Sequence, residues 1–413
     1  MAITKYLVSA LAVAGLAFAK GDGDGDDDDG RRRDGQMADP ITDLTTDCAG
    51  DLTIENQQDV STLSSCEKWD GDIIISEVVK SSISLTGVKQ VTGSLKAKNS
   101  SITELSAPNL NSIGDALSLS TCTALRSLDL SSLTKVKTLS LEALPKLQAL
   151  GFTRTVSQAT SILITNTDLT SLQGLDLETV GDFMVTNNPH LMEINVNKMT
   201  NITGYLNFAA NNKQLSVKFP NLEGAHNMTF RNVSEASLPS LHKMDGLLGF
   251  YSNFFMNISA PNLTATGDLV FTSNSAVMNI SMPKLETVKG GLQLANNSAL
   301  EDIEGFPDLK LITGALDITG KFKTVKLPSL KEVRGDANLQ STETFGCEPW
   351  QKLKDSDVIR GKLTCRERQE KPKTGDDQSG GDEEGHKGAA VAFAKAPAAA
   401  LLIAFVGALQ FFL

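Results

Sequence analysis

A short motif recurs along the middle of this 413-residue chain and constrains its fold more than any other feature. The motif places a leucine two residues after a proline, then an aliphatic residue, a glycine and alternating apolar residues, as in PKLETVKGGLQL from Pro283. From Pro220 onward, successive prolines of the motif lie 19, 22, 22, 24 and 21 residues apart. Weaker copies without the proline begin at Leu133, Leu177 and Met199. A period of about 20–24 residues is typical of solenoids, in which each coil packs against its neighbours.

The pattern within one motif predicts the structure of one coil. Alternating apolar residues, such as Leu292 and Leu294, form a short strand with one face inward. The preceding glycine permits the tight corner that leads into the strand. An inward asparagine after the strand can form hydrogen bonds with the backbone at the corners of neighbouring coils. A cysteine can replace this asparagine as a small, semi-apolar side chain. This slot holds Cys122, Asn188, Asn274 and Asn297.

The expected fold class is therefore mainly β, a right-handed parallel β-solenoid of leucine-rich, L-domain-like coils with disulfide-capped ends. Residues 41–366 provide about fifteen such coils at about 22 residues each. The pattern is irregular over 150–165, so the chain forms one continuous solenoid or two L-domains. Phenylalanines at strand positions predict a stacked core, and they are Phe183, Phe208, Phe250 and Phe271.

Cysteines bracket both ends of the repeat region. Cys48 and Cys66 lie 18 residues apart before it, and Cys347 and Cys365 lie 18 residues apart after it. Exposed solenoid ends need caps, and disulfides close them in an oxidising compartment, so we expect the pairs Cys48–Cys66 and Cys347–Cys365. Trp69 follows Cys66 by three residues, and Trp350 follows Cys347 by three residues. This spacing predicts that the two tryptophans plug the two ends of the solenoid. The fifth cysteine, Cys122, is expected to be buried and inert.

The two termini indicate targeting. Residues 1–19 combine a basic Lys5, an apolar run and a small-x-small cleavage site, which together predict a signal peptide. Residues 389–413 end in an apolar tail behind small residues, which predicts a GPI-attachment propeptide. Gly388 is the expected attachment residue, with Ser379 as the alternative. Residues 20–40 form an acidic segment expected to be disordered, and residues 367–388 form a polar stalk.

Composition argues against several functions. Lysine and arginine number 38 against 49 acidic residues, a formal charge of −11, so no basic surface for nucleic acid is expected. The chain has four histidines, too few and too scattered for most metal sites or for histidine-based catalysis. No cofactor is expected. Acidic residues cluster at Glu301, Asp302 and Glu304, but this cluster falls on a turn between coils, where a solvated surface is the simpler explanation.

N-x-S/T sequons are abundant, and in a secreted chain they predict N-glycosylation. Eight asparagines are predicted acceptors: Asn99, Asn201, Asn227, Asn232, Asn257, Asn262, Asn279 and Asn296. Asn257 and Asn279 occupy the same register of successive coils, so their glycans would stack. Seven of the eight fall between 201 and 296, whereas the stretch from about 100 to 200 holds none after Asn99. We hypothesise that any protein partner docks on this bare portion of the sheet.

Together, the signal peptide, the cysteine-capped PxLxx(V/I)xGxLxL coils, the sequons and the GPI tail resemble the fungal GPI-anchored cell-wall-organisation proteins. This receptor L-domain-like family includes protoplast-secreted and sporulation-specific members. The resemblance implies a non-enzymatic surface glycoprotein required for wall organisation, integrity and morphogenesis. It also implies a location on the outer leaflet of the plasma membrane, in the cell wall, or both. The implied partners are wall glucan or wall proteins and, through the GPI lipid, the plasma membrane.

Two other classes of function remain open from the sequence. A ligand-binding surface receptor is the first, because L-domains bind ligands in other settings. A wall-polysaccharide-modifying enzyme is the second, and it would need two carboxylates about 5–10 Å apart in a cleft. Glu301, Asp302 and Glu304 are the candidates for such a pair.

Overall fold

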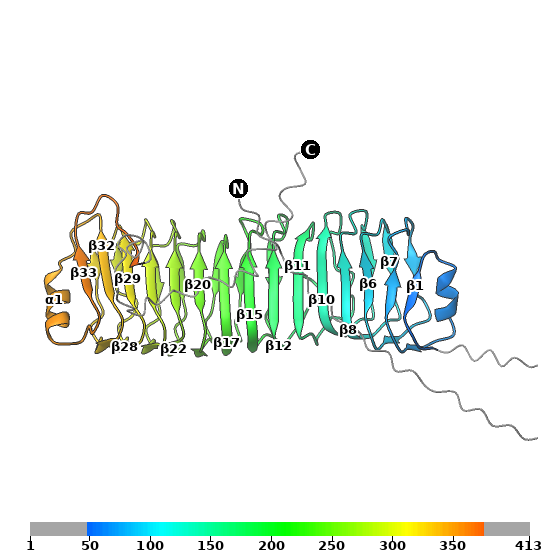
Figure 1. Cartoon of the computed structure of the whole chain (residues 1–413), viewed down its shortest axis with the longest axis horizontal. Helices are drawn as coiled ribbons and strands as arrows, with labels where there is room; N and C mark the ends of the chain where they lie inside the picture. The colour runs from blue at the N-terminus through cyan, green and yellow to red at the C-terminus, as the bar shows by residue number, and fades with distance from the viewer. Residues whose placement is uncertain (1–47, 376–413) are drawn as a thin grey trace, which may run out of the picture. The chain divides into compact units, whose positions relative to one another are not determined.

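The computed structural model describes residues 48–375, and these form a parallel β-solenoid of about 14 turns (Figure 1). The prediction of a mainly β, parallel solenoid is confirmed. The signal peptide, the acidic segment, Ser379, Gly388 and the propeptide lie outside the described residues.

A single 23-stranded sheet runs along the solenoid, and every coil adds a main strand to it. The main strands are β1 (Leu52–Ile54), β3 (Ile73–Ile75), β6 (Leu95–Lys98), β8 (Ser112–Ser120), β10 (Lys135–Leu144), β11 (Ser161–Thr167), β13 (Asp182–Thr186), β15 (Asn201–Ala209), β17 (Gly224–Arg231), β20 (Leu248–Tyr251), β23 (Leu269–Thr272), β26 (Leu292–Ala295), β29 (Leu316–Gly320), β32 (Ala337–Ser341) and β33 (Leu363–Arg366). Two-residue strands precede many of them, at the lower edge in Figure 1: β2 (Lys68–Trp69), β5 (Gln90–Val91), β12 (Thr179–Val180), β19 (Lys243–Met244), β22 (Ala265–Thr266), β25 (Thr287–Val288), β28 (Leu311–Ile312) and β31 (Glu332–Val333).

Smaller sheets lie on the return side of the coils. They comprise β4 (Ile83–Ser84), β7 (Glu104–Ser106) and β9 (Ser127–Asp129); β14 (Glu193–Asn195), β16 (Ser216–Lys218) and β18 (Glu235–Ser237); β21 (Asn257–Ser259) and β24 (Asn279–Ser281); and β27 (Asp302–Ile303) and β30 (Thr324–Val325). A 3-10 helix η1 (Asp59–Leu63) and one α-helix α1 (Glu348–Asp355) lie near the two ends of the described region. Across the irregular stretch, β10 pairs directly with β11, with Leu139 beside Ile162, so the main sheet continues there.

Stacked phenylalanines fill the middle of the core, as predicted. Phe183, Phe208, Phe250 and Phe271 are all buried. The rings of Phe250 and Phe271 stack with centroids 4.7 Å apart, and those of Phe183 and Phe208 meet edge to face at 5.2 Å. Phe208, Phe250 and Phe271 come from the same strand position, whereas Phe183 lies one inward position earlier, beside Leu206. Successive coils therefore bury large side chains against one another.

Buried asparagines after the main strands connect coil to coil, which confirms the prediction for Asn188, Asn274 and Asn297. The Nδ2 of Asn274 donates to the Phe250 carbonyl at 3.0 Å and to Oδ1 of Asn297 at 3.1 Å. The Asn274 backbone N–H also donates to Asn297 Oδ1, at 3.0 Å. Cys122 occupies the same slot as a buried free thiol, and burial raises its pKa. These bonds satisfy backbone groups that would otherwise be buried without partners.

The glycines before the main strands are required for a different reason than the one predicted. Gly267, Gly314 and Gly335 have no positive φ, so the tight corner does not demand glycine by its backbone conformation. Instead, a Cβ at Gly267 would lie 2.5 Å from the Gly246 carbonyl oxygen of the adjacent coil. The Gly267 backbone N–H donates to that same oxygen at 2.9 Å. Glycine is needed because neighbouring corners stack backbone to backbone.

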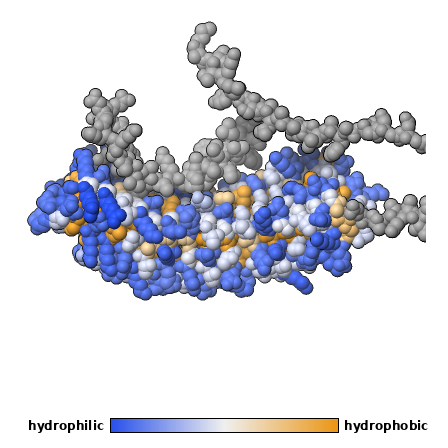
Figure 2. Space-filling model, turned by 60° about the horizontal axis from the view of Figure 1, so that its bottom comes forward, coloured by the Kyte–Doolittle hydropathy of each residue, from blue (hydrophilic) through white to orange (hydrophobic). Residues whose placement is uncertain are grey.

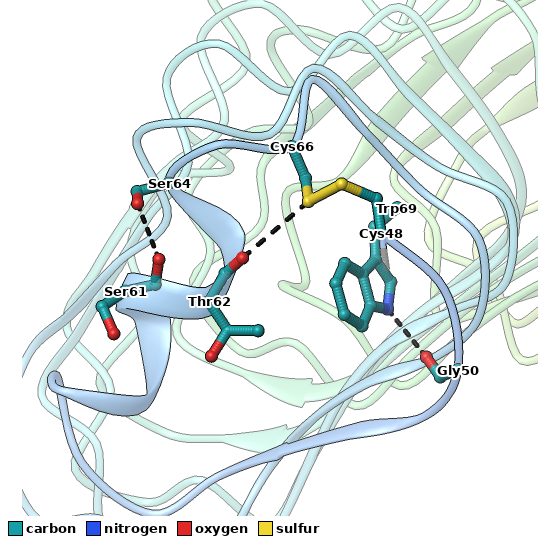
Figure 3. The surroundings of a disulfide bond; sticks show 7 residues. All are labelled: Cys48, Gly50, Ser61, Thr62, Ser64, Cys66 and Trp69. Carbon is teal, nitrogen blue, oxygen red and sulfur yellow. Dashed lines mark hydrogen bonds between the residues drawn. A yellow bond between two sulfur atoms is a disulfide. The ribbon is translucent and has the colours of Figure 1, made fainter. Parts of the chain in front are cut away.

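Disulfides close both ends of the repeat region, Cys48–Cys66 and Cys347–Cys365, as predicted. Trp69 is buried beside the first disulfide, and its Nε1 donates to the Gly50 carbonyl at 2.9 Å (Figure 3). Trp350, on α1, is the buried residue of that helix. Each tryptophan covers apolar residues that have no further coil to pack against, which is the function of a solenoid cap.

Candidate partner surfaces

The sequons occupy two kinds of position. Asn99, Asn201, Asn257, Asn279 and Asn296 are exposed, as a glycan acceptor must be. Asn257 pairs directly with Asn279 between β21 and β24, so the expected shared register is confirmed.

The other three predicted acceptors are partly buried and use their amides in the fold. Asn227 Oδ1 accepts the Leu247 N–H at 2.8 Å, and Asn262 Nδ2 donates to the Pro239 carbonyl at 2.9 Å. Asn232 has a φ of 58°, in the turn after β17. Asparagine tolerates this left-handed conformation better than most residues. These three asparagines therefore have structural reasons to be asparagine, independent of any glycan.

A cavity of about 690 Å³ opens on the edge that carries the two-residue strands, within the stretch that lacks sequons. Its lining includes Lys135, Lys137, Gln158, Glu178 and Lys198. Figure 2 brings this edge toward the viewer and shows a surface dominated by hydrophilic residues, with smaller hydrophobic patches. No pattern in the sequence indicated this cavity.

Three consecutive short corners create the cavity. In each coil, a corner runs from the inward residue at the position of the two-residue strand to the first inward residue of the main strand. Two residues lie between these inward residues in the corners 136–139, 159–162 and 180–183. Three residues lie between them in the flanking corners 113–117 and 202–206. The ladders register these positions across the coils, and a bulge between β8 and β10 absorbs the extra residue on the N-terminal side. The shorter corners leave a recess between longer ones.

The charged side chains around the cavity are largely balanced. Lys137 pairs with Asp115 at 3.2 Å, and Lys198 pairs with Asp176 at 2.6 Å, each between neighbouring coils. The cavity edge therefore presents many hydrogen-bonding groups but no strong field of one sign.

At the opposite ends of the main strands, the His190 imidazole forms a hydrogen bond with Asp168, and Gln148 donates to the other oxygen of that carboxylate. The hydrogen bond from Gln148, and then that from His190, lower the pKa of Asp168.

Two of the three residues of the acidic cluster on the return side, Glu301 and Glu304, form ion pairs. Glu301 lies 2.6 Å from Lys323, and Glu304 lies 2.7 Å from Lys326. The hydrogen bond from Lys323 lowers the pKa of Glu301. A glycosidic acid needs a raised pKa, so this environment is the opposite of what acid catalysis requires. Within residues 48–375, no group of three or more histidine, cysteine or acidic side chains is arranged to hold a metal ion.

Comparison with curated proteins identifies the family of this chain. It is 92% identical over 413 residues, the whole length of both chains, to "Cell surface GPI-anchored protein" of Arthroderma benhamiae. The chain belongs to the fungal GPI-anchored cell surface proteins. It is also 42% identical to "Protein ecm33" of Aspergillus fumigatus, over 80% of this chain and 83% of that one. With "Cell surface GPI-anchored protein ECM33" of Candida albicans it shares 33% identity, over 73% and 74%.

The resemblance found from the motifs is confirmed, and with it a location at the cell surface or wall. No protein-family model and no solved structure matches this member of the GPI-anchored surface proteins. Among the described residues, no helix is long and apolar enough to cross a membrane.

In this surface protein, the segment that follows the last coil lies across the outer face of the main sheet. Asn338 Nδ2 and Gln340 Nε2 donate to the Lys373 carbonyl at 2.9 and 3.1 Å. The Gly375 N–H donates to Asp317 Oδ2 at 3.1 Å. Asp317 and Gln340 are 1% and 2% exposed, although outward strand positions normally face solvent. The chain thus leaves the solenoid over its strand face.

The start of this segment is held by a carboxylate. Glu367 accepts hydrogen bonds from the backbone N–H groups of Gly346 and Phe345, in the turn that precedes α1. These bonds lower the pKa of Glu367. The ionised form is therefore the one that joins the last strand to the C-terminal cap.

Proposed function

We propose that this protein is a non-enzymatic scaffold of the fungal surface that organises the cell wall and supports its integrity and morphogenesis. The names of its relatives support a structural role, since they describe cell surface and cell wall proteins. The fold supports it as well, because a continuous parallel sheet buries its core coil by coil and presents long repetitive surfaces.

The observation that carries the non-enzymatic part is the state of the acidic cluster. Hydrolysis or transfer of a glycosidic bond needs one carboxyl that stays protonated to act as the acid. Glu304 is instead exposed and Glu301 half-buried. Both are paired with lysines of the next coil, and the pKa of Glu301 is lowered. Both tryptophans are buried in the caps, so neither offers a stacking platform for a sugar.

The proposed attachment of the scaffold has three parts. A GPI lipid on Gly388, or on Ser379, tethers the chain to the plasma membrane. N-linked glycans on the sequon asparagines, above all the exposed ones, cover the coils from 201 onward. Wall glucan or wall proteins are the proposed partners of the remaining surface.

A ligand-binding receptor is the second candidate, favoured by the cavity at 114–198. Capture of partners from intact walls distinguishes the two, because a scaffold stays with insoluble wall material whereas a receptor follows a discrete ligand or signalling protein.

Two measurements test the proposal. Incubation of the full-length protein with β-glucan should release no new reducing ends above the buffer rate, and sustained release would contradict a non-enzymatic scaffold. Deletion of the gene should make cells hypersensitive to a chitin-binding dye, with osmotic support restoring growth. A deletion strain with a normal wall would contradict the role in wall organisation.

A further inference from the structure

We propose that the cavity between residues 114 and 198 is a binding site for a neutral wall polysaccharide, occupied by a short stretch of a β-glucan chain. This inference rests on the proposed wall function and names the ligand of the scaffold. Its volume of about 690 Å³ falls in the range of about 300–1,000 Å³ that is usual for ligand clefts.

The recess is built into the coil lengths and does not depend on mobile side chains. Three consecutive corners are one residue shorter than the corners on either side. Lys137 and Thr160 stand where most other coils have a corner glycine, so the recess also receives side chains that other corners exclude. A channel across three coils, about 14 Å long at about 4.8 Å per coil, matches a short stretch of an extended sugar chain.

The chemistry of the lining favours a neutral, hydroxyl-rich ligand. Gln158, Thr160 and Glu178 offer amide, hydroxyl and carboxylate groups, all on exposed residues. Lys137 and Lys198 are compensated by acidic partners, which disfavours a polyanion. Sugar hydroxyls both donate and accept, so a lining of mixed donors and acceptors can satisfy them.

The same lining is unsuited to a protein partner. Protein interfaces are anchored by aromatic or large apolar side chains at their centre. The largest apolar residue of the lining, Val136, is 1% exposed and belongs to the core. In addition, cavity-lining Thr179 pairs with Asn201 of the adjacent strand, an exposed sequon residue. A glycan there would stand at the rim, where it obstructs a broad protein surface but leaves room for a narrow chain.

A single substitution can close the site. Gln158→Asn creates the sequon Asn-Ala-Thr with residues 159 and 160, which would place a glycan in the cavity. The matched control is Glu104→Asn, which creates the sequon Asn-Leu-Ser with residues 105 and 106 at an exposed position of β7, away from the cavity. Gln158→Trp fills the cavity without needing modification. In a deletion strain that shows the wall defect, we expect the full-length Glu104→Asn control to restore dye resistance and the two Gln158 variants to fail at equal surface level.

Direct binding identifies the ligand class. Full-length protein purified from membranes should bind a linear β-1,3-gluco-hexasaccharide, and Glu178→Ala should weaken binding about tenfold, the value of one charge-assisted hydrogen bond. Glu286→Ala is the matched control, because Glu286 occupies the same coil position outside the cavity. The backbone carbonyl of Glu286 accepts the Lys310 N–H, as the backbone carbonyl of Glu178 accepts the Thr200 N–H. This control should bind with unchanged affinity.

The outcomes separate this inference from the function on which it rests. A normal wall in the deletion strain contradicts the scaffold itself. A wall defect that Gln158→Asn and Gln158→Trp both rescue overturns the cavity as a site. Blocking variants that fail while the hexasaccharide does not bind overturn the polysaccharide and point to a protein ligand. Equal loss in Glu178→Ala and Glu286→Ala would show that binding lies elsewhere.

Discussion

Replacing Asn274 by alanine tests whether the buried asparagines hold neighbouring coils together. Asn274 is 0% exposed. Its Oδ1 accepts both the backbone N–H and the Nδ2 of Asn253 at 2.9 Å, and its Nδ2 donates to the Phe250 carbonyl and to Asn297 Oδ1. The substitution removes these four side-chain hydrogen bonds. It leaves the Asn253 N–H and the Phe250 carbonyl buried without this partner.

At about 1 kcal/mol for each hydrogen bond, the loss amounts to about 4 kcal/mol in the free energy of unfolding. Such a value lies at the upper end for point substitutions, because buried polar groups are left unsatisfied. Each coil contacts mainly its neighbours, so the loss is concentrated in the coils at 250–297. Exchange of the Asn253 amide hydrogen should accelerate on the order of 10³-fold, since about 1.4 kcal/mol corresponds to a factor of ten.

Hydrogen exchange of the full-length protein, read by mass spectrometry over peptides that contain Asn253, measures this effect locally. Guanidinium unfolding of the same samples gives the global change. Ser275→Ala is the control, because Ser275 is the exposed neighbour of Asn274, and its change should stay within about 0.5 kcal/mol. Equal exchange rates in the Asn274→Ala and Ser275→Ala proteins would refute the structural role of the asparagine ladder.

Four further predictions follow from the same contacts. Gly267→Ala should lower the unfolding free energy by about 1–3 kcal/mol, because its Cβ meets a backbone oxygen, and an unchanged Tm would refute the close corner contact. Removing the Cys347–Cys365 disulfide by Cys→Ser changes should lower stability by about 3 kcal/mol, measured in denaturant with and without reductant. The hydrogen-bonded Glu367 carboxylate has a lowered pKa. Its contribution to stability is therefore present above the pKa of Glu367 in the unfolded chain and is lost as the pH falls through its pKa in the folded chain. Hydrogen exchange of the backbone amides in the C-terminal cap should become faster in acid, and Glu367→Gln should abolish this pH dependence. Asp317→Ala should release the segment that ends at residue 375, seen as faster tryptic cleavage after Lys373, and unchanged cleavage would contradict the docking.

The repeat period and the inward positions of each coil could be predicted from the sequence because both depend on local patterns. Apolar alternation marked the strands, and the residue after each strand marked Asn188, Asn274 and Asn297. Two further ladder residues, Asn211 and Asn253, were missed. They follow Ala210 and Ser252, at positions with positive φ where other coils have asparagine. Counting from these turns would have found both.

Features that depend on register between coils could not be predicted. The cavity arises because one residue is absent from each of three successive corners, and a single sequence without aligned coils hides this difference. The docking of residues 369–375 was equally hidden, because their composition reads as a polar stalk. Asp317 and Gln340, which hold them, are outward residues that the strand pattern predicts to be solvated. The cavity and the docked segment both depend on contacts between residues that are distant along the chain, and a local sequence pattern does not record such contacts.

Complementation of a deletion strain with an anchored and an unanchored form tests the central claim most directly. The two genes encode the full-length chain and a chain that stops at Gly375, which keeps the docked segment and lacks the proposed attachment residues. We predict that the full-length gene restores growth on a chitin-binding dye without osmotic support, whereas the shortened protein is secreted and fails to do so. Equal rescue by both forms would contradict a scaffold that acts from an anchored position at the fungal surface.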